Sequence, residues 1–118
     1  MARVMKRIST HVLDTTLGKA AKDVMVRLER KESDGQWVEL KSSRTDADGR
    51  CAQLLPENEF LCAGLYRLLF DTGSYHAAQN VEAFYPVVEI NFQVRIGESQ
   101  FHIPLLLSPY GYTTYRGS

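Results

Sequence analysis

The sequence is poor in the residues that build metal and redox sites. It has two cysteines, Cys51 and Cys62, which are not spaced as a CxxC pair and have no histidine cluster beside them. This pattern indicates neither a zinc site nor a redox motif, so we expect free thiols and no bound metal. No HExxH pair and no glycine-rich phosphate loop occurs either.

The chain also lacks an excess of charge and a long hydrophobic run. Lys and Arg together number 14, Asp and Glu together number 14, and the formal net charge is zero. A balanced charge argues against a nucleic acid or an anionic membrane as partner, because both need a concentrated positive field. No run of about twenty apolar residues is present to span a bilayer.

No secretory leader is expected. The first seven residues contain basic side chains, but the polar segment Ile8-Ser9-Thr10-His11 follows in place of an apolar core. The chain ends in Arg-Gly-Ser and not in a peroxisomal Ser-Lys-Leu type of address. We therefore expect a cytoplasmic location, with a peroxisomal or periplasmic one left open.

What is present is the pattern of an all-β protein. Hydrophobic residues make up 44% and charged residues 24% of the 118 residues, which is typical of one globular domain spanning 1–118. Short alternating segments separated by polar turns predict an antiparallel β-sandwich with one brief helix. The expected strands are 7–14, 23–30, 37–44, 50–54, 65–71, 87–96 and two within 101–118, and the expected helix is 73–83 with Ser74 as its N-cap.

Strand periodicity predicts which side chains share a face. In the first strand Ser9, His11 and Leu13 lie on one face. In the second, we expect Arg27 and Glu29 to face water.

The last eighteen residues, 101–118, are rich in Leu, Ile, Tyr and Thr and are interrupted once at Ser108-Pro109. They predict two adjacent strands that run to the end of the chain. Because an apolar and aromatic terminus is unfavourable in water, we expect it to be buried in an interface or a site.

Three histidines and one arginine are candidates for chemistry. His76 lies in the expected helix, where we predict a solvent-exposed side chain with no role. His11 and His102 lie in strands near opposite ends of the chain, and two interpretations stay open: they converge on one site, or each is a separate hydrogen-bonded strand histidine. If they converge, one imidazole can take a proton from water near neutral pH, and Arg50 after the Asp48-Gly49 turn can stabilise an anion. No Gly-x-Ser-x-Gly elbow surrounds a serine, so a covalent acyl-serine mechanism is disfavoured.

Several stretches resemble the transthyretin family across essentially the whole chain. They are His11-Val12-Leu13-Asp14 followed by Gly18, the turn from Thr45 to Arg50, Phe84-Tyr85-Pro86, and the long tail from His102 to Ser118. The Leu-Leu-Ser-Pro-Tyr-Gly-Tyr-Thr-Thr part is similar to transthyretin itself. The terminal Tyr115-Arg116-Gly117-Ser118 is typical of the family's hydrolytic branch.

The resemblance implies a sandwich of two four-stranded sheets that assembles as a homotetramer, a dimer of dimers, with active sites at the interface between dimers. It implies His11, Arg50, His102 and Ser118 as the catalytic set, and His11, Arg50 and Tyr115 as substrate contacts. The implied reaction is hydrolysis of 5-hydroxyisourate to 2-oxo-4-hydroxy-4-carboxy-5-ureidoimidazoline in urate breakdown, with no cofactor.

The alternative that the resemblance leaves open is a non-enzymatic carrier of a hydrophobic or aromatic ligand. Two histidines and an arginine in the expected channel argue against it, because such a ligand favours an apolar pocket.

Overall fold

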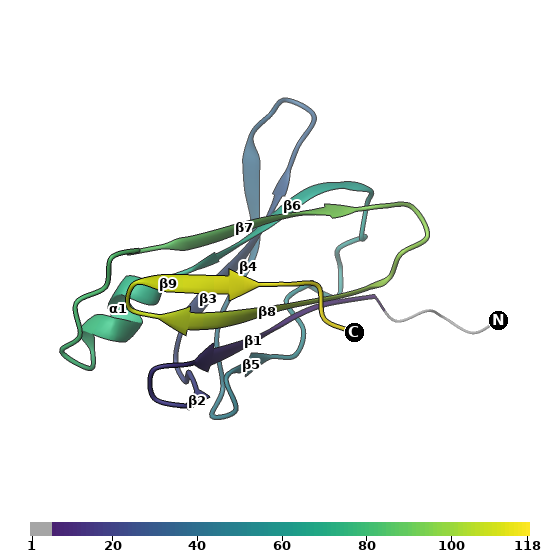
Figure 1. Ribbon diagram of the computed structural model, residues 1–118. Helices are drawn as coiled ribbons and strands as arrows, with labels where there is room; N and C mark the ends of the chain where they lie inside the picture. The colour runs from purple at the N-terminus through teal and green to yellow at the C-terminus, as the bar shows by residue number, and fades with distance from the viewer. Residues whose placement is uncertain (1–5) are drawn as a thin grey trace.

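The computed structural model describes residues 6–118. Residues 1–5, on which the expectation of no leader rests in part, lie outside the described residues. The chain forms two β-sheets that pack face to face, with a short helix at one end of the sandwich (Figure 1). The expected β-sandwich is confirmed.

One sheet joins the two ends of the chain. Its strand order is β2-β1-β8-β9, with β5 paired to the same strand β1. The strands are β1 (Arg7–Asp14), β2 (Lys19–Ala20), β5 (Arg50–Cys51), β8 (Gln100–Ser108) and β9 (Gly111–Thr114). β1 and β8 run parallel and pair along the whole of β1, from Arg7 with Gln100 to Asp14 with Leu107.

The other sheet has the order β4-β3-β6-β7 and is antiparallel throughout. Its strands are β3 (Met25–Lys31), β4 (Trp37–Arg44), β6 (Gly64–Phe70) and β7 (Val88–Val94). β3 and β4 form a hairpin whose tip projects beyond the sandwich (Figure 1). Gly35 at this tip has φ +85°, a conformation that glycine adopts without steric cost.

The core lies between the two sheets because alternate residues of every long strand point inward. In β1 the buried positions are Ile8, Thr10, Val12 and Asp14, and the intervening residues are half-buried. In β8 the inward residues Phe101, Ile103, Leu105 and Leu107 are all buried. The outward side chains of these two strands are thereby left on one continuous surface.

The sequence predicted strands 7–14 and 37–44 with the bounds that the structure has. It did not predict β2, and β5 begins at Arg50 as expected but is shorter than the expected strand 50–54. The first sheet therefore has five strands where four were expected, and its β1–β8 pair is parallel where an antiparallel sandwich was expected.

The helix prediction was wrong at both ends. α1 spans Thr72–Ala77, and its N-cap is Asp71, whose carboxylate accepts bonds from the Ser74 main-chain N–H (3.1 Å) and hydroxyl (2.8 Å). Asp71 is the better cap because one carboxylate satisfies both donors. The chain leaves the helix before Asn80, which has φ +58°. No helix within residues 6–118 is long and apolar enough to cross a membrane.

Two side chains predicted to be exposed are buried. His76 is 2% exposed, so its prediction as a solvent-exposed residue was wrong. Glu29 is 7% exposed although β3 keeps its regular register with β6 at this point, where Glu29 pairs with Arg67. Its carboxylate is held by Arg67 at 2.6 Å and by Arg27 at 3.0 Å.

Candidate functional site

The strand register brings the two strand histidines to one surface. Ser9 pairs with His102 across the parallel strands β1 and β8, and His11 is two residues along β1 from Ser9. Paired residues on neighbouring strands, and residues two apart on one strand, point to the same face of a sheet. His11 and His102 therefore both lie on the outer face of the five-stranded sheet. Their Cα atoms are diagonal neighbours, roughly 8 Å apart by strand geometry.

Arg50 lies on the other side of His11. β5 pairs with β1 so that Arg50 is the direct partner of His11, which puts its exposed side chain on the same face. The preceding turn fixes this register, because the Asp46 carboxylate accepts bonds from the main-chain N–H groups of Asp48 and Arg50, each at 2.9 Å. The sequence-predicted trio of His11, Arg50 and His102 thus meets on one face.

The turn also fixes the tautomer of His11. The Nε2 atom of His11 lies 2.8 Å from the main-chain oxygen of Asp48. A carbonyl oxygen only accepts, so Nε2 carries the proton and donates it. In the neutral ring Nδ1 is then the nitrogen with a free lone pair.

Ser9 is a site residue that the sequence analysis did not identify. Its hydroxyl lies 2.9 Å from Nδ1 of His102, and so it orients that ring. The signal in the sequence was weak: Ser9 was placed on the same face as His11, but its neighbour on β8 depends on a parallel pairing across 93 residues. Alternation along one strand cannot reveal such a pairing.

The environment of His102 favours the uncharged imidazole. Partial burial lowers the pKa of His102 below its ordinary value, and the positive charges of Arg50 and His11 lower it further. An imidazole that is neutral at neutral pH can act as a proton acceptor.

The C-terminal tail closes over this ring. The main-chain N–H of Gly117 donates to the main-chain oxygen of His102 at 2.8 Å. A Cβ atom built on Gly117 would lie 2.5 Å from Cδ2 of His102, so only glycine fits this close approach. Ser118 follows directly and is exposed.

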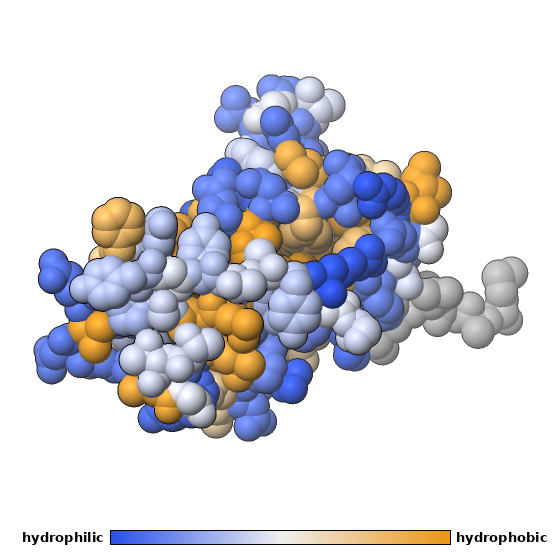
Figure 2. Space-filling view, in the orientation of Figure 1, coloured by the Kyte–Doolittle hydropathy of each residue, from blue (hydrophilic) through white to orange (hydrophobic). Residues whose placement is uncertain are grey.

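Tyr115 lies at the rim of this group. It is 55% exposed, and it borders a shallow hollow of about 310 Å³ together with His102, Phe101 and Arg116. The tail is exposed in the single chain, so its expected burial in an interface stays a prediction. Figure 2 shows this side of the molecule, where hydrophobic and weakly polar groups gather over β8 and β9 between hydrophilic borders.

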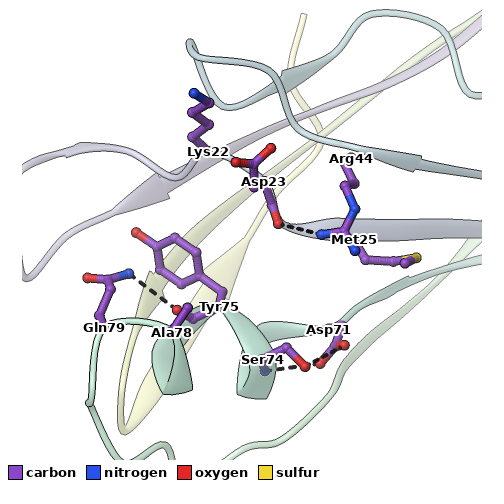
Figure 3. A pocket seen from close by; sticks show the side chains of 9 residues that line it. All are labelled: Lys22, Asp23, Met25, Arg44, Asp71, Ser74, Tyr75, Ala78 and Gln79. Carbon is purple, nitrogen blue, oxygen red and sulfur yellow. Dashed lines mark hydrogen bonds between the residues drawn. The ribbon is translucent and has the colours of Figure 1, made fainter.

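A second hollow, of about 350 Å³, lies apart from this face. Figure 3 shows that α1 and the ends of β3 and β4 form it, with Lys22 and Arg44 on one side and Tyr75 and Gln79 on the other. None of the predicted site residues lines it, and we do not assign the site there. Among residues 6–118 there is no cluster of three or more His, Cys, Asp or Glu that could hold a metal ion.

The outer face therefore offers a small set of complementary groups. It has an imidazole held neutral, a second imidazole with a fixed tautomer and a permanent cation, all beside a glycine-tethered chain end. Such groups can bind a small polar anion and activate water against it.

The model of the HIUase/Transthyretin family matches residues 8–117. The chain belongs to this family. It is 46% identical to 5-hydroxyisourate hydrolase from Mus musculus over 119 aligned residues, which cover 100% of both chains. Among solved structures, 5-hydroxyisourate hydrolase from Klebsiella pneumoniae superposes with a TM-score of 0.83 at 37% identity, covering 97% of this chain and 100% of that one.

A transthyretin with bound ligand is about equally close to this chain in fold. Sea bream transthyretin in complex with thyroxine superposes with a TM-score of 0.87 at 34% identity, covering 93% of each chain. The backbone is therefore common to a hydrolase and to a thyroxine-bound transthyretin, so the fold by itself does not assign the function.

Proposed function

We propose that this protein hydrolyses 5-hydroxyisourate to 2-oxo-4-hydroxy-4-carboxy-5-ureidoimidazoline. The observation that carries the proposal is the group on the outer face: His102, covered by Gly117, has His11 as its diagonal neighbour, and Arg50 lies next to His11 on the far side. The full-length similarity to relatives named for this activity supports it.

The reaction needs a base for water and a cation for the substrate. One imidazole removes a proton from water while the hydroxide oxygen attacks the ring carbonyl carbon. The carbonyl becomes a tetrahedral oxyanion, the carbon–nitrogen bond of the ring then breaks, and the leaving nitrogen takes the proton that the imidazole removed from water, while the second imidazole orients the water. Arg50 binds the anionic ring and stabilises the oxyanion.

The two histidines present different ring nitrogens to substrate and water. His11 offers Nδ1, because the Asp48 carbonyl occupies its Nε2–H. His102 contacts Ser9 through Nδ1, and its Nε2 has the lone pair in the tautomer whose Nδ1–H donates to the Ser9 hydroxyl. Ser118 acts by hydrogen bonding to substrate or water and forms no covalent bond, and Tyr115 contributes a substrate contact at the rim. These groups supply the reaction without a metal or an organic cofactor.

We further propose that the protein works as a homotetramer, a dimer of dimers, in which the outer face lines a channel between dimers. Leu13 and Leu106 pair across β1 and β8 on this face and are only half-buried in the single chain. The exposed Tyr115 adds further apolar surface at the tail. Covering this surface with a second dimer would bury it and exclude water from the trio.

The test is the ultraviolet absorbance decay of 5-hydroxyisourate generated in place from urate and urate oxidase. We expect the protein to accelerate the decay strongly over the spontaneous rate, and Arg50→Ala to remove most of the acceleration. No acceleration by an assembled tetramer would overturn the proposal. It would favour the carrier, for which the similarity to thyroxine-bound sea bream transthyretin is the supporting observation.

A further inference from the structure

The guanidinium of Arg116 is held on three sides just before the tail reaches His102. Nη1 donates to the Glu98 carboxylate at 2.9 Å, and Nη2 donates to the main-chain oxygen of Gln100 at 3.2 Å. The guanidinium also lies over the ring of Phe101, 4.8 Å from its centroid. This arrangement fixes both the position and the plane of the arginine head.

Glu98 is the charged partner in this arrangement. It lies in the turn between β7 and β8, outside the group of residues proposed to act on substrate. Its hydrogen bond with Arg116 lowers its pKa, so the carboxylate is ionised at neutral pH. Within residues 6–118 its second oxygen, Oε1, is buried with no hydrogen-bond partner. Burying an unpaired carboxylate oxygen is unfavourable, and the contact with Arg116 offsets this.

The tail depends on few contacts at this point. β9 ends at Thr114, and beyond it the main chain of the tail is anchored by the Gly117 bond to His102. Arg116 immediately precedes Gly117, and the backbone of Gly117 packs on the His102 ring. Any freedom of Arg116 is therefore transmitted to Gly117 and Ser118 over a distance of one or two residues.

We propose that Glu98 is a positioning residue: by holding Arg116 it keeps the end of the chain against His102 and so aligns the site for catalysis. This inference rests on the proposed hydrolase activity, but the holding of the tail can be measured separately from it. Glu98 touches neither the imidazoles nor the cation of the site and acts through Arg116 alone.

The variant to make is Glu98→Gln, which keeps the size of the side chain and removes its charge. Its matched control is Glu59→Gln, because Glu59 forms a comparable ion pair with Arg30 at 3.2 Å and its side chain is 32% exposed against 30% for Glu98. We expect kcat/KM to fall about threefold to tenfold in Glu98→Gln, mainly through kcat, and to stay unchanged in Glu59→Gln.

Salt provides a second activity readout. The Glu98–Arg116 pair is partly exposed, so it weakens as the Debye length falls from about 30 Å at 0.01 M to about 3 Å at 1 M salt. We expect the ratio of wild-type to Glu98→Gln activity to approach one at high salt. A purely structural role of Glu98 would leave this ratio constant.

How firmly the tail is held is measured as the exchange rate of the Gly117 amide hydrogen, followed by NMR. We expect this amide to exchange about threefold to tenfold faster in Glu98→Gln than in wild type or in Glu59→Gln. Equal exchange rates in the three proteins would overturn the inference even if wild type proved inactive on 5-hydroxyisourate. Faster exchange with unchanged kcat/KM in an active enzyme would also overturn it, because the tail would then be held without consequence for the reaction.

Discussion

Replacing Gly117 by alanine tests whether the tail and the His102 ring form one unit. The added Cβ would lie 2.5 Å from Cδ2 and 3.2 Å from Cγ of His102, and 3.3 Å from Cγ of Pro104. Ordinary carbon contacts are about 3.5 Å or longer, so the ring or the tail must move by about 1 Å. Because Pro104 is buried in β8, it cannot yield in place of the ring.

Either movement disturbs the proposed chemistry. If the ring moves, its 2.9 Å bond to the Ser9 hydroxyl lengthens toward 4 Å, beyond hydrogen-bonding distance. If the tail moves, the Gly117 bond to His102 is lost and Ser118 leaves the site. A misplacement of this size at reacting groups reduces turnover by up to about 100-fold, so we expect kcat/KM to fall between about tenfold and 100-fold.

The assay is the decay of freshly generated 5-hydroxyisourate, with thermal unfolding measured in parallel. Gly111→Ala is the matched control, because a Cβ there meets only the Ser108 hydroxyl at 3.9 Å and the same tail gains the same methyl group. We expect both variants to unfold near the wild-type temperature and only Gly117→Ala to lose activity. Equal activity in the two variants would refute the argument that the close approach to His102 matters.

Three further results are expected. Ser9→Ala should lower kcat/KM about threefold to tenfold because the His102 ring loses its partner, and Ser9→Thr, which retains the hydroxyl, should restore it. An NMR titration should give His102 a pKa below its ordinary value of about 6.5, and removal of the charge in Arg50→Ala should raise that pKa. Because the pKa of His102 is lower in the folded state than in the unfolded state, its contribution to folding stability is complete above about pH 6.5 and is lost as the pH falls through the folded-state pKa. A wild-type pKa at or above 6.5 would contradict the electrostatic argument. Thr45→Val should lower the free energy of unfolding in urea by about 2 kcal/mol, because it removes a buried hydroxyl that accepts from one main-chain N–H and donates to one carbonyl. An unchanged midpoint of urea unfolding would mean that these main-chain groups find other partners.

Strand identity could be predicted from the sequence where alternation was strong. The segment 7–14 alternates throughout, and its predicted bounds and faces match the structure. The helix could not be bounded in the same way, since two caps competed: Asp71 and Ser74 both precede an apolar stretch, and only the three-dimensional bond from Ser74 to Asp71 decides between them. His76 is buried within this six-residue helix, which the composition did not indicate.

The candidate site, like the fold, could be predicted from the sequence only in part. The residue types were visible in the sequence, but their convergence depends on β1 pairing with both β5 and β8. Those pairings join segments about 40 and 93 residues apart, and no local pattern encodes them; resemblance to a known family supplied what periodicity could not. Ser9 remained unassigned because its role exists only through its neighbour on β8.

The fold alone does not decide between an enzyme and a carrier. Hydrolase and thyroxine-bound transthyretin superpose on this chain about equally well, so the backbone is compatible with both. The difference lies in what the outer face offers a ligand. Here a permanent cation lies beside an imidazole kept neutral by burial and by that same cation. A hydrophobic ligand would have to desolvate Arg50 without compensation, which is unfavourable, whereas an anionic substrate pairs with it. The charge that disfavours a hydrophobic ligand on this face is thus one of the charges that lower the pKa of His102.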